Sequence, residues 1–150
     1  MKDRPFIGVI GGSNARGHIL KLAEDVGRLI AKRGGVLVCG GLSGVMEASA
    51  RGAKLAGGLT IGILPSRNTR DANEYIDIPI ATGMDISRNF IIACTCDAFI
   101  AIDGAYGTLT EMAYALQLGK KVIGLESWNI DGVIIASSPE EAVDLVFQGI

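Results

Sequence analysis

The sequence has 150 residues, 49% of them hydrophobic and 21 of them glycine, which predicts one domain over residues 1–150 with an aliphatic core and many tight turns. Its net charge of −2 provides no basic stripe, so we expect no nucleic-acid partner. Three cysteines without CxxC spacing and one histidine, His18, argue against a metal site, and no apolar run is long enough for a membrane span or a signal sequence, so we expect a cytoplasmic protein.

The first half of the chain repeats one pattern, in which an apolar strand runs into a glycine turn and then a helix. In chain order we expect strand 6–10, a helix from Gly17 to Ile30, strand 36–38, a helix over 45–56 and strand 60–64. Segment 66–74 is polar and has no apolar period. We interpret it as a solvated connection, and the alternative is a mobile lid over a site.

The second half continues the alternation of strands and helices. In chain order we expect an edge strand over 75–80 interrupted by Pro79, a helix over 87–96, strand 98–102, a helix over 108–118, strand 122–125, a short strand over 133–135 and a helix beginning at Ser138. Ser138, Pro139 and Glu141 form a strong helix start signal. The order of elements favours parallel pairing with right-handed crossovers, and predicts an α/β, Rossmann-like, doubly wound and mainly parallel sheet with helices on both faces.

Three glycine turns each follow a predicted strand and precede a predicted helix. They are Gly11-Gly12-Ser13, Gly40-Gly41-Leu42-Ser43-Gly44 and Gly104-Ala105-Tyr106-Gly107. In a parallel sheet such turns lie at the carboxyl edge and converge on one crevice, where the unpaired N–H groups of helix N-termini attract anions. The three turns together favour a phosphate-bearing ligand, although none matches the dinucleotide or P-loop motif.

Glu111 lies one turn into the helix that follows the third glycine turn. Thr108 and Glu111 have the spacing of a capping box, in which each side chain satisfies a backbone donor of the other, and this is the simpler interpretation. The alternative is a general acid or base beside a phosphate-binding turn.

Three further polar residues each have two interpretations. Arg88 precedes an apolar helical stretch, and is either a solvated charge or a clamp for phosphate or carboxylate. Asp103 would repel an anion at this turn unless it meets a hydroxyl group or a cation. Tyr106 either stacks on a ligand ring or is simply exposed.

The segments Gly-Gly-Leu-Ser-Gly-Val-Met (40–46), Ser-Arg-Asn (87–89) and Asp-Gly-Ala-Tyr-Gly-Thr-Leu-Thr-Glu (103–111) together resemble the LOG-like family, long mislabelled as possible lysine decarboxylases. The match spans nearly the whole chain. The resemblance implies a Rossmann-like fold, a homodimer or larger homo-oligomer, and hydrolysis of the N-glycosidic bond of a nucleoside 5′-monophosphate. We reject lysine decarboxylation because no lysine is placed to form a pyridoxal Schiff base.

The family motif PGGxGTxxE falls on residues 103–111. The resemblance therefore implies that Glu111 and Arg88 are the catalytic residues, with Glu111 stabilising oxocarbenium-like charge or activating water. It also implies that main-chain N–H groups hold the 5′-phosphate. The expected ligand-binding residues are Gly12, Ser13, Gly40, Gly41, Ser43, Gly44, Asp103, Gly104, Tyr106, Gly107 and Thr108.

Two departures from the family pattern leave a second hypothesis open. Asp103 and Ala105 replace a proline and a glycine, and Asn89 replaces the usual lysine after the arginine. The second change resembles the branch that includes the molybdenum cofactor carrier proteins, which bind a phosphorylated pterin without turnover. The two hypotheses are thus a phosphoribohydrolase, and a carrier of a molybdopterin-type ligand or nucleotide monophosphate. Both need no resident cofactor. A weaker third view, a link to DNA-uptake proteins, conflicts with the acidic balance of the chain.

A partner surface is expected on the helices of the second half. Helix 108–118 and residues Ile91, Ile92 and Cys94 are more apolar than one face of a sheet requires. We therefore expect a homodimer with these helices at its interface.

Overall fold

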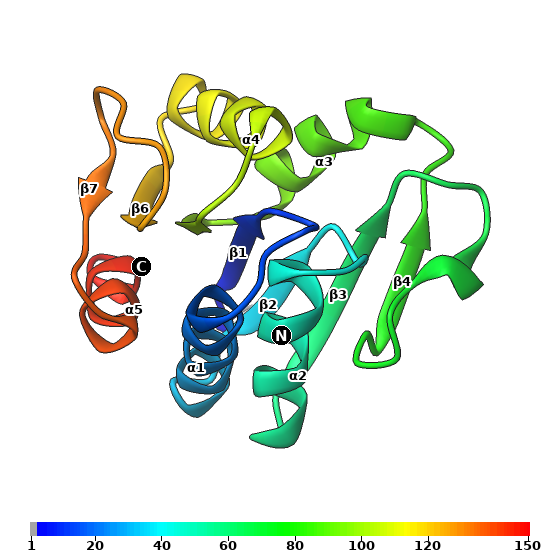
Figure 1. Ribbon diagram of the computed structural model, residues 1–150, viewed down its shortest axis with the longest axis horizontal. Coiled ribbons are helices and arrows are strands. Elements are labelled where there is room, and N and C mark those ends of the chain that lie inside the picture. Colours follow the sequence, from blue (N-terminus) through cyan, green and yellow to red (C-terminus); the bar gives the residue numbers. More distant parts are fainter. Residues whose placement is uncertain (1–2) are drawn as a thin grey trace.

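The computed structural model describes residues 3–150, which form one seven-stranded sheet in the order β4-β3-β2-β1-β5-β6-β7 (Figure 1). Every neighbouring pair of strands is parallel. The strands are β1 (Phe6–Gly11), β2 (Val36–Cys39), β3 (Leu59–Leu64), β4 (Ile78–Ala81), β5 (Ala98–Ile102), β6 (Lys121–Leu125) and β7 (Ile134–Ile135). The predicted parallel sheet is confirmed.

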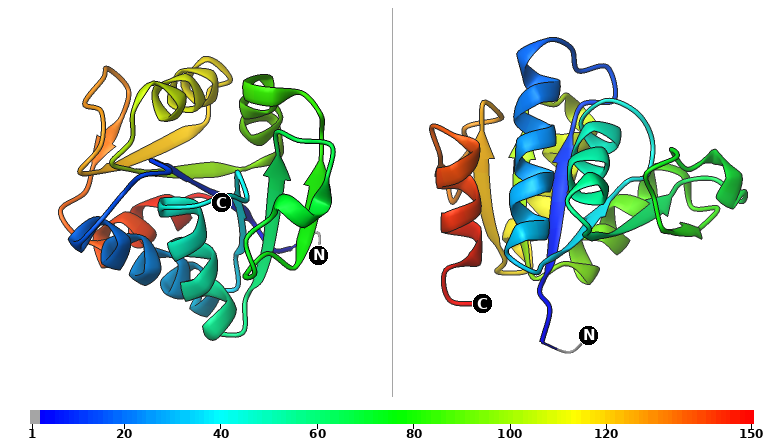
Figure 2. Two further views of the ribbon diagram at one scale, coloured as in Figure 1. Left: turned by 45° about the vertical axis from the view of Figure 1, so that its right-hand side comes forward. Right: turned by 90° about the horizontal axis from the view of Figure 1, so that it is seen from below.

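In the described part of the chain, five helices cover the two faces of the sheet, as predicted for a doubly wound fold. They are α1 (His18–Lys32), α2 (Val45–Leu55), α3 (Arg88–Thr95), α4 (Tyr106–Gln117) and α5 (Pro139–Phe147). Helices α3 and α4 lie on one face, and α1, α2 and α5 lie on the other (Figures 1 and 2). Two short 3-10 turns, η1 (Thr69–Asp71) and η2 (Asp85–Ser87), flank β4.

Successive side chains of the central strands point to opposite faces of the sheet, so each face has its own hydrophobic core. Ile7 and Val9 of β1 belong to the core under α1, α2 and α5, whereas Ile10 belongs to the core under α3 and α4. The ring of Phe99 in β5 fills the space beside Gly8, where a Cβ atom would lie 2.4 Å from the ring. These contacts fix β1 against β5 at the centre of the sheet.

Helices α1 and α2 pack so closely that their backbones are in contact at two glycines. A Cβ atom on Gly27 would lie 1.9 Å from the carbonyl oxygen of Ser49, and one on Gly52 would lie 2.0 Å from that of Glu24. Arg51 of α2 bridges to the Glu24 carboxylate at 2.8 Å. This close packing holds the loops that precede the two helices side by side at the carboxyl edge.

Most predicted element boundaries lie within two residues of those observed, but the edge strand expected over 75–80 begins at Ile78, and α4 also differs at its start. Ser138 caps α5 by accepting a hydrogen bond from the Glu141 amide, and Pro79 lies in the edge strand β4, both as predicted. Helix α4, however, begins at Tyr106, two residues before the expected start. Asp103 and Gly104 both have positive φ, 52° and 111°, so the chain turns sharply at the end of β5 and the helix begins early.

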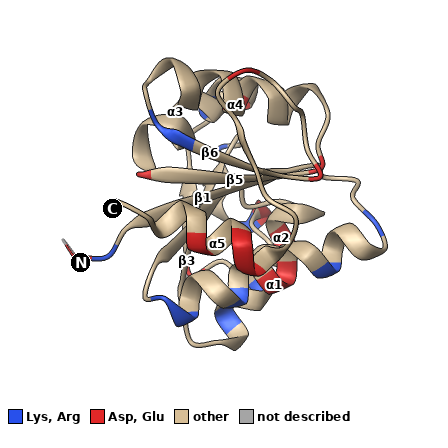
Figure 3. Cartoon of the chain, turned by 90° about the vertical axis from the view of Figure 1, so that its left-hand side faces the viewer, with Lys and Arg blue, Asp and Glu red and all other residues tan. Residues whose placement is uncertain are grey.

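Basic and acidic residues are interspersed along the elements on the side of the molecule that carries α1 and α5 (Figure 3). Within residues 3–150, no helix combines the length and the hydropathy that a membrane crossing demands.

Candidate functional site

A cavity of about 300 Å³ lies at the carboxyl edge of the sheet, where the strand order reverses between β1 and β5. This reversal is the usual ligand-binding position of doubly wound sheets. The cavity is lined by Gly11, Gly12, Ser13, Leu42, Met46, Pro65, Asp85, Ile86, Arg88, Asn89, Ala105, Gly107, Thr108 and Glu111. The loops after β1, β2, β3 and β5 and the segment after β4 all contribute, so the predicted convergence of glycine turns is present.

Arg88 is the first residue of α3 and is only 8% exposed, which contradicts its interpretation as a solvated charge. Its Nε donates to the Ile63 carbonyl at 2.9 Å, and Nη1 donates to the Asn89 side chain. A Cβ atom on Gly40 would lie 2.7 Å from Nη2, so any larger residue at that position would displace the guanidinium from its observed place. Burial lowers the pKa of Arg88, and the nearby Glu111 carboxyl opposes that shift.

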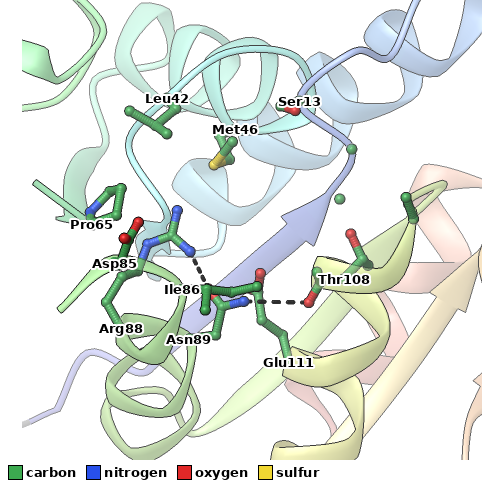
Figure 4. Close-up of a pocket in the computed structure, with 14 residues that line it drawn as sticks. Ser13, Leu42, Met46, Pro65, Asp85, Ile86, Arg88, Asn89, Thr108 and Glu111 are labelled. Carbon is green, nitrogen blue, oxygen red and sulfur yellow. Dashed lines mark hydrogen bonds between the residues drawn. The ribbon is translucent and has the colours of Figure 1, made fainter.

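Glu111 reaches the same cavity from the second turn of α4 and is 9% exposed (Figure 4). The predicted capping box is wrong: α4 has Ala105 at its N-cap with no side-chain cap, and Thr108 is already inside the helix. Burial raises the pKa of Glu111 to about 8, against the opposing effect of Arg88. The Glu111 side chain is therefore largely protonated at neutral pH.

No ion pair joins Arg88 to Glu111 among the contacts of residues 3–150, and no hydrogen bond within that range uses the Glu111 carboxyl group. The two side chains converge on one cavity from α3 and α4 without pairing (Figure 4). Both groups are therefore free to bind a ligand between them. Over the same residues, no three His, Cys, Asp or Glu side chains gather in a metal-binding arrangement.

The N-termini of α1, α2, α3 and α4 all lack a side-chain cap, and those of α2 and α4 follow the second and third glycine turns. In α2 the Val45 amide donates to the Gly12 carbonyl at 3.0 Å, which ties the first two glycine turns together. In α4 the first turn contains Gly107 and Thr108, both of which line the cavity. By contrast, α5 is capped by Ser138. Uncapped N–H groups and the positive end of the helix dipole make this part of the cavity suitable for an anion.

Asn89 was noted in the sequence only as a departure from a family pattern, yet it connects the two helices of the site. Its side chain accepts from Arg88, and its Nδ2 lies 3.4 Å from the Gly107 carbonyl oxygen and 3.2 Å from Thr110 Oγ1. Asn89 thus holds the guanidinium of α3 against the first turn of α4.

The second glycine turn lies behind the cavity wall rather than on its surface. Gly40 backs Arg88, and the Gly41 amide donates to Cys39 Sγ at 3.4 Å. Ser43 donates to the Ser13 carbonyl at 3.0 Å, and Gly44, at φ 67°, packs against the Gly12 carbonyl. Of the residues of this turn, the cavity lining includes only Leu42.

The third glycine turn is divided between the cavity and the surface. Gly104 packs against the Thr108 side chain, and Asp103 is anchored through its carbonyl by Ser127 Oγ at 2.6 Å. Neither residue belongs to the cavity lining, and neither does Tyr106. The Tyr106 ring is exposed and stacks on Trp128, with 6.2 Å between ring centroids.

Eight lining residues were missed by the sequence analysis as ligand-binding candidates: Gly11, Leu42, Met46, Pro65, Asp85, Ile86, Asn89 and Ala105. Asp85 and Ile86 follow β4, an edge strand whose end gave no recognisable motif. Segment 66–74 contributes nothing to the lining of this cavity, which fits its interpretation as a connection. Its Asn73 side chain instead donates to the Leu42 carbonyl at 2.8 Å and braces the loop after β2.

The model of the SLOG cluster4 family matches residues 4–148. Among similar sequences, a protein of Archaeoglobus fulgidus is 48% identical over 139 residues, covering 92% of this chain and 91% of its own length. The cytokinin riboside 5′-monophosphate phosphoribohydrolase of Mycobacterium tuberculosis is 34% identical over 131 residues, covering 81% of this chain and 70% of the enzyme.

Among solved structures, the molybdenum cofactor binding protein of Rippkaea orientalis is similar at a TM-score of 0.91 and 43% identity, with 97% of each chain covered. The molybdenum cofactor carrier protein of Chlamydomonas reinhardtii follows at 0.88 and 34%, again with 97% of each chain covered. DNA processing protein A of Streptococcus pneumoniae, at 20% identity and a TM-score of 0.76, shares the fold. The resemblance to LOG-like proteins is thus confirmed, and the chain belongs to the SLOG cluster4 family.

Proposed function

We propose that this protein binds a phosphorylated heterocycle of the molybdopterin type in the cavity between β1 and β5, and acts as its carrier. The observation that carries the proposal is the unpaired arrangement of Arg88 and Glu111 beside an uncapped helix N-terminus. A buried arginine is costly unless an anion or hydrogen-bond acceptors compensate it. Here the protein supplies neutral acceptors and leaves the compensating anion to a ligand.

The chain is similar to two molybdenum cofactor proteins over nearly their full length. This similarity favours a molybdopterin-type ligand over other phosphorylated heterocycles. The buried Asn89 supports it as well. It holds the Arg88 guanidinium in place with a neutral amide, so the site contains one fixed positive charge for the ligand phosphate.

A second candidate is N-glycosidic hydrolysis of a nucleoside 5′-monophosphate, which the protonated Glu111 favours. A carboxyl group with a pKa of about 8 can donate a proton to a departing base near neutral pH. The similarity to a named phosphoribohydrolase is consistent with this candidate. The two functions use one cavity and differ in the ligand, a phosphorylated pterin or a nucleoside 5′-monophosphate, and in whether that ligand is cleaved.

The test is gel filtration of the purified protein, under anaerobic conditions, with molybdenum cofactor released from a molybdoenzyme. We expect molybdenum and the pterin, detected by fluorescence after oxidation, to elute with the protein. Arg88→Lys should weaken binding by about tenfold or more, because lysine cannot reproduce the forked contacts of the guanidinium. Arg33→Lys, at the carboxyl end of α1 and the opposite edge of the sheet, is the matched control.

A parallel incubation with nucleoside 5′-monophosphates separates the two candidates. Release of free base that disappears in Glu111→Gln would replace the carrier by the hydrolase. Absence of both co-elution and base release would reject the proposed site function altogether.

A further inference from the structure

The cavity has two chemically different ends. Ser13, Thr108 and the first turn of α4 lie at one end, where the uncapped N–H groups favour an anion. Asp85 and Pro65 lie at the other end, with Arg88 and Glu111 between the two (Figure 4). A ligand that fills the cavity therefore meets an anion site at one end and a carboxylate at the other.

The carboxylate of Asp85 is available to such a ligand. The residue is exposed, and within residues 3–150 its carboxylate takes part in no hydrogen bond or ion pair. Its main chain is nevertheless fixed, since the Asp85 amide donates to the Pro65 carbonyl at 3.0 Å. A fixed backbone with an unpaired carboxylate on the cavity wall is suited to recognise a donor group.

The backbone conformation of Asp85 is also unusual. Its φ is 57°, in the left-handed region. Glycine would be less strained there than aspartate, and asparagine would be tolerated equally well. The turn geometry therefore does not explain why a carboxylate is present. Strained non-glycine residues of this kind concentrate at ligand-binding sites.

The side chains around Asp85 suit a flat ring. Pro65 and Ile86 flank it, and Leu42 and Met46 form the facing apolar wall from the loop after β2 and from α2. A planar heterocycle held between these walls would direct its edge at the carboxylate and its phosphorylated arm at α4. Arg88 lies between the two ends, where its guanidinium would bind a phosphate oxygen of that arm.

We propose that Asp85 is the specificity-determining residue of this cavity, and that it selects a ring carrying adjacent N–H and NH₂ donors, the 2-amino-4-oxopyrimidine edge shared by pterins and guanine. A carboxylate accepts both donors of that edge in a bidentate pair. Adenine presents a ring acceptor beside its amino group and cannot form the pair. The inference rests on the proposed function, because it requires that the cavity bind a phosphorylated heterocycle.

The experiment compares guanosine, inosine and adenosine 5′-monophosphates with a phosphorylated pterin, by calorimetric titration of the full chain. The guanosine and inosine ligands differ only by the 2-amino group that Asp85 would bind. We expect the guanosine ligand to bind about tenfold more tightly than the inosine ligand, and the adenosine ligand to bind most weakly. The relative affinities of pterin and guanosine ligands then show which source of the shared edge the protein prefers.

Asp85→Asn is the decisive variant, because asparagine tolerates the left-handed conformation and keeps the size of the side chain while removing the double acceptor. We expect it to lose the preference for guanosine over inosine and to retain the thermal stability of the wild type. Asp131→Asn, in the loop between β6 and β7, is the matched control and should keep the preference.

The outcomes separate this inference from the function on which it rests. Equal affinity for guanosine and inosine ligands in the wild type, or a preference that survives in Asp85→Asn, would overturn the role of Asp85 while leaving the ligand site in place. Failure of every phosphorylated heterocycle to bind would overturn both.

Discussion

Glu111 is the residue whose chemistry depends most on the fold. As a free side chain glutamate ionises well below neutral pH, but in this cavity burial raises its pKa to about 8. The charged form therefore costs free energy in the folded protein unless a ligand compensates it. A buried, protonated carboxyl group beside a buried arginine is typical of functional sites.

The raised pKa of Glu111 predicts a particular dependence of stability on pH. Below the unfolded value near 4.5 both states are protonated and there is no penalty. Between about pH 4.5 and 8 the unfolded chain releases this proton and the folded chain keeps it, so the free energy of unfolding falls by up to about 1.4 kcal/mol per pH unit. Above pH 8 the penalty is complete.

The Glu111→Gln variant has no carboxyl group to titrate, so its free energy of unfolding escapes this fall. The difference in free energy of unfolding, variant minus wild type, should therefore rise between pH 5 and pH 8. Urea unfolding at both pH values measures the difference, with Glu74→Gln on an exposed loop as the control. A Glu111→Gln difference that is the same at both pH values would contradict the buried, protonated carboxyl group.

At the residue scale the sequence singled out Arg88 and Glu111, and the structure places both at the cavity, but not for the reasons that the sequence suggested. Its spacing from Thr108 led us to interpret Glu111 as a capping-box residue, and a solvated charge was one interpretation of Arg88. Both interpretations used only neighbouring residues in the sequence. The structure replaces both interpretations through long-range contacts, since the Arg88 guanidinium binds the Ile63 carbonyl of β3, 25 positions away. Asp85 was missed for the same reason: its place in the cavity depends on how β4 lies beside β3.

Two consecutive lysines join elements on opposite faces of the sheet. At the start of β6, Lys120 donates to the carbonyls of Ala93, Cys94 and Cys96 at the end of α3, at 2.7, 2.9 and 2.7 Å. Lys121, the next residue, donates to the Leu145 carbonyl of α5 at 2.9 Å. Successive side chains of a strand point to opposite faces, so each lysine reaches a different helix. Both satisfy carbonyl groups that a helix end leaves unpaired.

Lys120→Met should destabilise the protein by about 1–3 kcal/mol, because it leaves three carbonyl groups without their charged donor. Hydrogen exchange should then rise in the last turn of α3 but not in α5, and Lys121→Met should show the reverse. Lys32→Met, at the exposed end of α1, is the control for loss of a positive charge. Uniform loss of protection in both helices from either variant would argue against separate caps.

At the element scale the sequence predicted the strands and helices well, since glycine, proline or charged residues bound the apolar runs and the long helices have a helical apolar period. The start of α4 was missed because Asp103, a non-glycine residue, adopts a left-handed conformation there. The lysine caps could not be predicted either. The pair at positions 120–121 reads as a solvated charge run until the ends of α3 and α5 are placed beside it.

The outer surface of α3 and α4 carries an apolar patch, which we define as Phe90, Cys94, Tyr114 and Leu118, all of them exposed. Phe90 and Tyr114 meet edge to face, with 5.2 Å between ring centroids. Ile92, which the sequence analysis included in the expected partner surface, is fully buried against the sheet instead. The patch is therefore smaller than expected, but it still lies on the predicted helices.

We expect this patch to form the interface of a homodimer, since exposed contiguous apolar surface of this kind marks interaction sites on soluble proteins. Tyr114→Arg places a charge at its centre and removes the ring that orders Phe90, so it should shift the protein to monomers in light scattering at micromolar concentration. Leu55→Arg introduces the same charge on α2, at an exposed leucine on the opposite face, and should leave the assembly unchanged. A monomeric wild type would contradict the interface directly. A dimer that survives Tyr114→Arg but dissociates with Leu55→Arg would place the interface on the other face of the sheet.

Because α3 supplies Arg88 and α4 supplies Glu111, a dimer formed through this patch would also brace both helices of the cavity. Ligand binding should therefore weaken in the same variant that dissociates the dimer.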